Sequence, residues 1–167
     1  MNENIKIVFV FSGIVLISTI LLTFIHQKTA PIISKNLMNK LESSSNGMFP
    51  ESDFVKDMKD YKELYLKNEV IGYVVESSSY GYSSDINLIV GFNKDKTIRE
   101  VIVLEQQETP GLGGEITSEK FLFQFKDKKI DDINLKQNSN GIDGVTGATV
   151  SSNAVVVAVR AAYEKIQ

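Results

Sequence analysis

Residues 141–152 read GIDGVTGATVSS and lead directly into residues 152–166, SNAVVVAVRAAYEKI. The second stretch is rich in alanine and apolar on most faces, which predicts a largely buried helix. Hydroxyl side chains gather before and at its start, on Thr146, Thr149, Ser151 and Ser152. A helix start exposes unpaired N–H groups and a partial positive charge, so it favours an anionic group. Either Ser151 or Ser152 caps this helix, or a hydroxyl here holds a phosphate by hydrogen bonds or covalently.

A second stretch with binding potential is residues 108–114, ETPGLGG. Pro110 fixes one backbone angle, and the glycines permit positive φ and close approach of a ligand. Glu108 could accept a hydrogen bond from the N–H of a ring. The stretch matches neither the phosphate-binding loop nor the dinucleotide fingerprint. Taken alone, it is equally typical of a tight connection between a strand and a helix.

Around these two stretches the sequence predicts an α+β fold. Residues 61–66 and 70–76 form a predicted hairpin, a loop follows, and residues 86–92 and 98–104 alternate in hydropathy as strands do. Residues 117–125 suit a short helix with Phe121, Leu122 and Phe125 inward, and residues 130–136 suit a short strand. The predicted class is an antiparallel sheet packed with helices, without internal repeats.

Residues 7–25, IVFVFSGIVLISTILLTFI, contain no charged side chain. As a helix they would span roughly 30 Å, the thickness of the hydrocarbon layer. A cleaved signal peptide is the alternative, but its apolar run is usually shorter and a small-x-small site should follow. We therefore expect a transmembrane anchor over residues 1–30, a polar connector, helical or irregular, over residues 31–48, and one globular domain over residues 49–167. The positive-inside rule does not decide the orientation.

Composition excludes several classes of function. The chain has 167 residues, no cysteine, one histidine and a formal net charge of −3. There is no basic stripe for nucleic acid, no thiol nucleophile and no histidine cluster for a metal, so we expect neither a nucleic-acid partner nor a metal site. Without a histidine near a hydroxyl or an evident carboxylate pair, hydrolytic catalysis is disfavoured.

The residues from Asp143 to Ser151, DGVTGATVS, resemble the flavinylation motif of the FMN-binding domain family. Residues 103–116, VLEQQETPGLGGEI, and residues 79–92, SYGYSSDINLIVGF, resemble one branch of that family. This branch contains the G subunit of the Rnf complex and the C subunit of the sodium-pumping NADH:quinone reductase. Two departures are visible: glutamines occupy positions 106 and 107, where relatives often have histidine, and Ser151 stands where threonine is more frequent.

The resemblance implies a covalent FMN, joined through its phosphate to Ser151. It also implies contacts to the cofactor from both stretches. The implied binding residues are Thr146, Gly147, Ala148, Thr149, Val150, Glu108, Thr109, Gly111 and Leu112, with no catalytic residue. Asp143 occupies the acidic position associated with the flavin transferase, which takes FMN from FAD using magnesium.

The function implied by the resemblance is that of an electron-carrying subunit of a membrane-bound, ion-translocating ferredoxin:NAD oxidoreductase. Its expected partners are the other Rnf subunits, especially the D subunit, the flavin transferase during maturation, and the membrane. We expect a single-pass protein of the cytoplasmic membrane with its flavin domain on the outer face. The alternatives are the role of the C subunit in the quinone reductase, a membrane-anchored flavin-binding or sensor module without redox coupling, and a stand-alone flavin reductase.

Overall fold

The structure, a computed structural model, describes residues 3–136 and 141–167. Residues 1–2 fall within the predicted anchor and residues 137–140 within the predicted globular domain, and both groups lie outside the described residues. The chain divides into two compact units, Met1–Asn39 and Lys40–Gln167, which are described separately.

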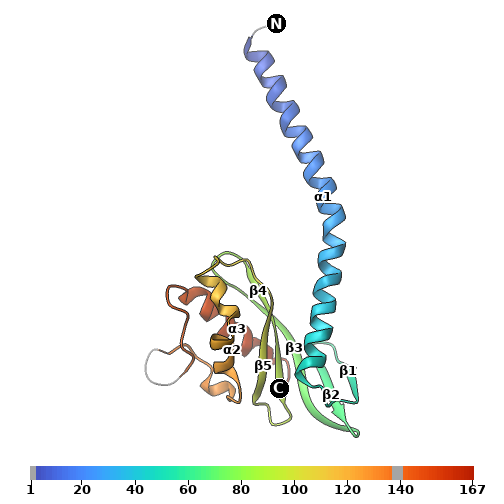
Figure 1. The fold of residues 1–167 in the computed structure, drawn as a ribbon, viewed down its shortest axis with the longest axis vertical. Coiled ribbons are helices and arrows are strands. Elements are labelled where there is room, and N and C mark those ends of the chain that lie inside the picture. Colours follow the sequence, from blue (N-terminus) through green and yellow to red (C-terminus); the bar gives the residue numbers. More distant parts are fainter. Residues whose placement is uncertain (1–2, 137–140) are drawn as a thin grey trace. The chain divides into compact units, whose positions relative to one another are not determined.

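The first unit contains most of one long helix, α1 (Glu3–Met48), drawn in blue in Figure 1. The helix passes through Pro31 without ending, so the predicted connector is helical, one of the two forms that the sequence left open. The large apolar side chains between Ile7 and Ile25 are all exposed. By length and composition, α1 is able to cross a membrane.

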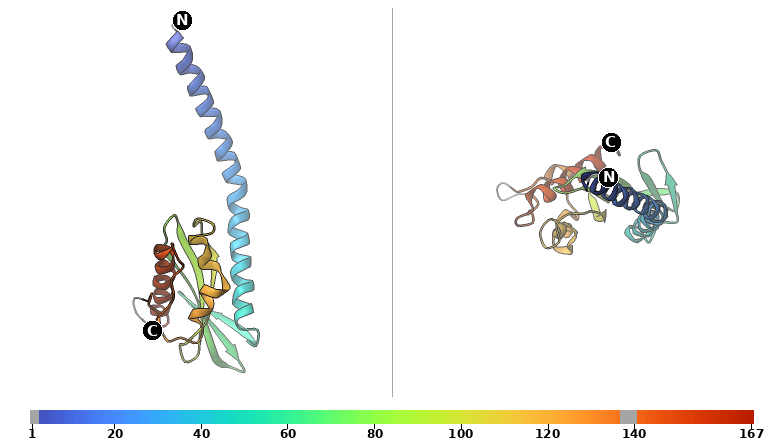
Figure 2. Two further views of the ribbon diagram at one scale, coloured as in Figure 1. Left: turned by 60° about the vertical axis from the view of Figure 1, so that its left-hand side comes forward. Right: turned by 90° about the horizontal axis from the view of Figure 1, so that it is seen from above.

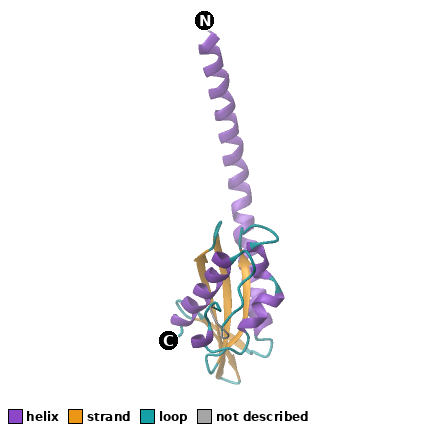
Figure 3. Cartoon of the chain, turned by 90° about the vertical axis from the view of Figure 1, so that its left-hand side faces the viewer, coloured by secondary structure: helices purple, strands orange, loops and turns teal. Residues whose placement is uncertain are grey.

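The second unit is built on one five-stranded antiparallel sheet in the order β1-β2-β3-β4-β5. Figure 1 labels the strands, and Figure 3 shows them in orange. The strands are β1 (Phe54–Asp57), β2 (Lys62–Leu66), β3 (Glu69–Tyr80), β4 (Asp85–Asn93) and β5 (Ile98–Glu105). The predicted hairpin is confirmed: β2 and β3 are joined at Lys67 and Asn68, both at positive φ, as a tight two-residue turn requires.

Helices cover this sheet and complete the core (Figure 2). Helix α3 (Thr149–Glu164) packs on β3 and β4, while α2 (Glu119–Leu122) and the 3-10 turn η2 (Phe123–Phe125) pack on β5. Apolar side chains of the three strands meet Phe121, Phe125 and the buried face of α3 in one cluster. The end of α1 joins the unit too, because Lys40 Nζ donates to the carbonyl oxygens of Val103, at 3.2 Å, and Leu104. The predicted α+β class is therefore confirmed.

Local differences from the prediction have identifiable causes. Strand β3 continues to Tyr80, through residues predicted as a loop, because Ser77–Tyr80 pair with β4. Strand β1 was not predicted, since all four of its residues are exposed and show no alternation. The strand predicted over residues 130–136 is wrong: the segment holds the 3-10 turn η3 (Ile130–Asp132) and one isolated bridge, from Leu135 to Ile142. The helix predicted from residue 152 begins three residues earlier.

Candidate functional site

The two stretches singled out in the sequence meet at one pocket of about 480 Å³. This volume lies within the range of small-molecule sites. One wall is the start of α3 with the residues before it, and the other is the loop after β5, which leads into the 3-10 turn η1 (Gly113–Thr117). The lining residues are Tyr82, Glu108, Thr109, Leu112, Gly113, Gly147, Ala148, Thr149, Val150 and Ser151.

Eight of the ten predicted binding residues therefore line the same pocket. The two exceptions are Thr146 and Gly111, which do not line it. Gly111 has a φ of +75°, in the left-handed region that a glycine at this position was expected to permit. A Cβ at Gly111 would have no neighbouring atom within 4 Å. A larger pocket, of about 600 Å³, contains no residue of either stretch. The pocket at Ser151 is thus the candidate site.

The centre of the site is a hydrogen bond between two buried side chains. The Ser151 hydroxyl donates to Oε2 of Glu108, joining the first turn of α3 to the loop after β5. Ser151 is 1% exposed and Glu108 is 5% exposed. A buried carboxylate needs several donors to remain charged, and Ser151 supplies only one of them.

The remaining donors to Glu108 are backbone N–H groups of the turn between β3 and β4. Oε1 accepts from Ser83 at 2.9 Å and Ser84 at 3.4 Å, and Oε2 accepts from Tyr82 at 3.2 Å. Burial alone would raise the pKa of the Glu108 carboxyl, but the hydrogen bonds from Ser151 and from these backbone groups outweigh burial and lower its pKa. Glu108 is therefore a carboxylate at neutral pH, with its oxygens directed at donors within the chain.

Gly113 provides the space in which Glu108 and Ser151 meet. A Cβ at Gly113 would lie 2.8 Å from Glu108 Oε2, 2.8 Å from Ser151 Oγ and 2.9 Å from Glu108 Cβ. These distances are shorter than non-bonded contacts allow, so a larger residue would push the two side chains apart. The sequence identified Gly113 as permitting an unusual backbone shape. Its role in the structure is instead to leave room for the side chains of its neighbours.

The start of α3 corrects the expected cap. Helix α3 begins at Thr149, its N-cap is Ala148, and no side chain caps it, so the prediction of Ser151 or Ser152 as N-cap is wrong. Ser152 lies inside the helix, where its hydroxyl donates to Ala148 O and accepts from Val145 N–H, both at 2.9 Å. The first intrahelical N–H bond at this end runs from Ser152 to Ala148. The N–H groups of the three preceding residues consequently have no partner within the helix.

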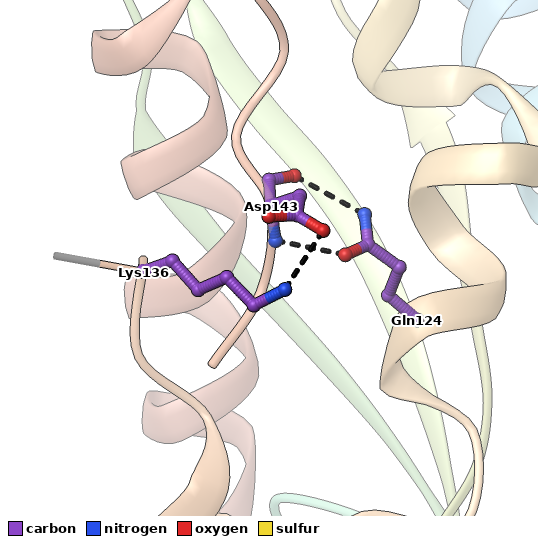
Figure 4. A network of polar contacts seen from close by, with 3 residues as sticks. All are labelled: Gln124, Lys136 and Asp143. Carbon is purple, nitrogen blue, oxygen red and sulfur yellow. Dashed lines mark hydrogen bonds and ion pairs between the residues drawn. The ribbon is translucent and has the colours of Figure 1, made fainter. Parts of the chain in front are cut away.

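The first residue of the motif, Asp143, is held by a separate polar network (Figure 4). Gln124, at the centre of η2, accepts from Asp143 N–H at 2.8 Å and donates to Asp143 O at 3.1 Å. The carboxylate of Asp143 pairs with Lys136 Nζ at 2.9 Å. Its side chain remains 67% exposed, so the acidic group is open to solvent at the beginning of the motif.

The rim of the pocket is apolar and exposed. Tyr82, Leu112 and Val150 are 72%, 48% and 54% exposed, and each comes from a different segment. Three features of the site were not predicted from the sequence, namely Tyr82 and Gly113 as lining residues and the contact of Gln124 with Asp143. The contact between the turn of residues 82–84 and Glu108 joins segments that are far apart in the sequence. No local sequence pattern predicts it, because it depends on how β3, β4 and β5 are aligned.

Comparison with known proteins gives the same assignment as the motifs. Residues 81–164, just over half of the chain, match the model of the FMN-binding domain family. The chain is 30% identical over 156 residues to the G subunit of the proton-translocating ferredoxin:NAD(+) oxidoreductase complex of Clostridium ljungdahlii, covering 90% of this chain and 84% of that one. It is 39% identical over 107 residues to the G subunit of the ion-translocating oxidoreductase complex of Methanosarcina acetivorans, covering 64% of this chain and 57% of the relative.

Solved structures show the same fold at lower identity. The crystal structure of NqrC from Shewanella oneidensis superimposes with a TM-score of 0.52 at 22% identity, covering 68% of this chain and 66% of that one. The C subunit of the Na(+)-translocating NADH-quinone reductase from Parabacteroides distasonis gives 0.50 at 23% identity, covering 61% and 57%. With both motifs in one pocket, with the matching family model and with this fold, the chain belongs to the FMN-binding domain family.

Proposed function

We propose that this chain is the electron-transferring G subunit of a membrane-bound, ion-translocating ferredoxin:NAD oxidoreductase complex, and that FMN is attached through its phosphate to Ser151. The observation that carries the proposal is the position of the Ser151 hydroxyl. It lies in the first turn of α3, on the wall of the pocket formed by both family motifs. The relatives named as G subunits of such complexes support the assignment of the complex.

The residues present fit a flavin with a phosphate group. The N–H groups of the first turn of α3 and the helix dipole favour a phosphate at Ser151. Tyr82, Leu112 and Val150 offer apolar surface for an aromatic ring at the rim. Thr149 and Thr109 add hydroxyls for polar contacts. A pocket of about 480 Å³ has the volume of a small-molecule site, and its open rim would leave one side of a bound ring accessible.

A bound flavin would supply the electron-transfer chemistry, while the protein supplies position and electrostatic environment. Within this chain, the start of α3 would offset the charge of a phosphate, and the loop of residues 108–114 forms the opposite wall of the pocket. Because the described pocket contains no histidine and no paired carboxylates that could act as an acid and a base, we assign it no substrate reaction of its own. The chain acts as a carrier within an oxidoreductase complex.

The membrane and the other subunits complete the proposal. Helix α1 is long and apolar enough to cross a membrane, and we propose that residues 1–30 form a single anchor that places residues 49–167 on the outer face of the cytoplasmic membrane. The partners would be the other subunits of the complex, including the D subunit. During maturation a flavin transferase would deliver FMN, meeting the chain at the exposed carboxylate of Asp143.

A second assignment, the role of the C subunit in a sodium-pumping NADH:quinone reductase, is favoured by the fold shared with two solved structures of such proteins. These structures are only 22% and 23% identical to this chain, whereas the relatives named as G subunits reach 30% and 39%. The G subunit is therefore the better supported assignment. The shared fold supports a flavin-binding domain in either complex.

The test is peptide mapping of the full chain produced in detergent after co-expression with a flavin transferase. The wild-type chain should gain the mass of one FMN less one water, and fragmentation should place it on Ser151 within the tryptic peptide of residues 137–160. Ser151→Ala should abolish the modification. Ser152→Ala is the matched control, because it removes a neighbouring buried hydroxyl whose hydrogen bonds among the described residues go to Val145 and Ala148.

Flavin mapped to Thr149 or Ser152 would refute the attachment residue and leave the family assignment in place. An unmodified wild-type chain beside an active transferase would refute the proposed covalent FMN. Co-purification distinguishes the complexes: the chain should be recovered with ferredoxin:NAD oxidoreductase activity. Recovery with NADH:quinone reductase activity would instead support the role of the C subunit.

A further inference from the structure

The contact between Ser151 and Glu108 has a consequence for how a phosphate is joined to this chain. A serine hydroxyl is a weak nucleophile until a neighbouring group removes its proton. In this structure the proton of Ser151 already points at Oε2 of Glu108. We propose that Glu108 is the group that accepts the Ser151 proton when FMN is attached. This inference rests on the proposed attachment at Ser151 and assigns a chemical role within it.

The step balances with FAD as the co-reactant. Ser151 Oγ forms a bond to the phosphorus on the flavin side of the pyrophosphate, and the bond from that phosphorus to the bridging oxygen breaks. The electron pair of the broken bond leaves with AMP, and the proton of Oγ moves to Glu108 Oε2. The products are a phosphodiester at Ser151, AMP and a neutral Glu108 carboxyl. No group is oxidised or reduced in this step.

The location of Glu108 suits this role for three reasons. Its carboxylate is held from behind by the backbone N–H groups of Tyr82, Ser83 and Ser84, so it stays in place if the tip of the loop moves. None of the ion pairs among the described residues includes Glu108, so no cation competes for its oxygens. The hydrogen bonds also lower the pKa of the Glu108 carboxyl, so it is ionised across the neutral range and Oε2 can act as an acceptor.

After the transfer, the same contact would disfavour an ionised Glu108. The Ser151 oxygen no longer has a proton to donate once it is esterified, and the new phosphodiester carries a negative charge beside the carboxylate. A protonated Glu108 relieves this repulsion and can itself donate to an ester or phosphate oxygen. Glu108 therefore gains a proton in the same step in which Ser151 gains a negatively charged phosphodiester.

The test measures the rate of covalent flavin attachment to the full chain in detergent, with FAD, magnesium and the flavin transferase. Attachment is followed by in-gel flavin fluorescence and by intact mass from pH 6 to pH 9. Glu108→Gln should slow attachment by at least about a hundredfold at pH 7, the usual lower range for loss of a general base. The control is Glu105→Gln, which changes a nearby carboxylate that accepts a hydrogen bond from Asn87 Nδ2 at 3.5 Å, and it should keep the wild-type rate.

The decisive readout is the ratio of wild-type to variant rates as a function of pH, because the titrations of the transferase cancel in it. Without Glu108 the hydroxyl must lose its proton to solvent, so the ratio should fall by about tenfold for each pH unit gained. Glu108→Asp keeps a carboxylate in a shorter side chain. Its rate should be lower than wild type by a factor that does not change with pH.

Three outcomes would overturn the inference. Equal rates for wild type and Glu108→Gln would show that no proton passes to Glu108. A Glu108→Gln deficit that is the same at every pH, with tyrosine fluorescence showing folded protein, would show that Glu108 only positions Ser151. A wild-type chain that gains no flavin would refute the proposed attachment and this inference with it, whereas the first two outcomes leave the attachment intact.

Discussion

The Ser151 hydroxyl donates a hydrogen bond to the carboxylate of Glu108, a residue 43 positions earlier in the chain. The same carboxylate accepts from backbone N–H groups of residues 82–84. One buried side chain thus joins three segments, namely the β3–β4 turn, the loop after β5 and the first turn of α3. The position of the Ser151 hydroxyl consequently depends on the charge state of Glu108.

This arrangement predicts a loss of stability in acid. The folded-state pKa of Glu108 is lowered from 4.5, so its stabilising contribution is fully present above about pH 4.5 and is lost as the pH falls through the folded-state value. Glu108→Gln places an amide N–H₂ against backbone donors and should cost about 2 kcal/mol or more at pH 7. The difference from wild type should shrink below pH 4.5.

Tyrosine fluorescence can follow this unfolding selectively. The chain has no tryptophan, and its six tyrosines all lie between residues 61 and 163, within the sheet-containing unit. Denaturant unfolding at several pH values, with Glu105→Gln as control, gives the comparison. A constant difference between wild type and Glu108→Gln from pH 7 to pH 3 would contradict the prediction.

Gly113 gives a second prediction, about space rather than charge. Gly113→Ala places a methyl group within 2.8 Å of Glu108 Oε2 and Ser151 Oγ, so it should lower the free energy of unfolding by about 1–3 kcal/mol. It should also slow flavin attachment, because the hydroxyl and the carboxylate are forced apart. Gly114→Ala is the matched control: its nearest contact, to Thr109 O, is 3.4 Å. Equal stability and attachment in both variants would show that the loop simply moves aside.

The anchor gives a third prediction. Because residues 7–25 contain no charge and their large apolar side chains are exposed on α1, the full chain should remain in the membrane pellet after alkaline carbonate extraction. Mass spectrometry should recover an intact amino-terminal peptide from the pellet. A soluble mature chain that begins near Ala30 would show instead that the apolar run is a cleaved signal.

The sequence predicted the architecture and both walls of the site, because each of these is a local pattern. Alternation from Ile86 to Phe92 indicated a strand, and the apolar character of the last helix indicated burial. The helix start was misplaced by three residues because Ser151 and Ser152 resemble cap residues. In the structure Ser152 instead contacts Val145 and Ala148 from inside the helix.

Contacts between distant segments could not be predicted from local patterns. Glu108 was expected among the residues that contact the flavin, and the sequence did not predict that its oxygens accept from donors in the turn of residues 82–84 and at Ser151. That geometry depends on the register of β3 with β4 and of β4 with β5.

Strand β1 was missed for a different reason. Its four exposed residues show no alternation in hydropathy that would predict a strand. The strand forms because it pairs with β2 at the edge of the sheet.

The last prediction concerns Gln124, which holds the beginning of the segment Asp143–Ser151. Its side-chain amide makes two hydrogen bonds with the backbone of Asp143, at 2.8 and 3.1 Å (Figure 4). Gln124→Ala removes both and should lower the free energy of unfolding by about 1–2 kcal/mol. Gln124→Glu can still accept from Asp143 N–H but cannot donate to Asp143 O when ionised, so it should recover only part of that loss.

Lys136→Ala is the matched control, because it removes the exposed ion pair to the same residue and should cost less than about 1 kcal/mol. Lys136→Ala frees the Asp143 side chain from its ion pair, whereas Gln124→Ala frees the Asp143 backbone and leaves that ion pair in place. If the transferase requires a fixed backbone at the start of the motif, flavin attachment should slow in Gln124→Ala and stay near wild type in Lys136→Ala. The reverse order would show that the Asp143–Lys136 pair, rather than the backbone clamp, presents the motif.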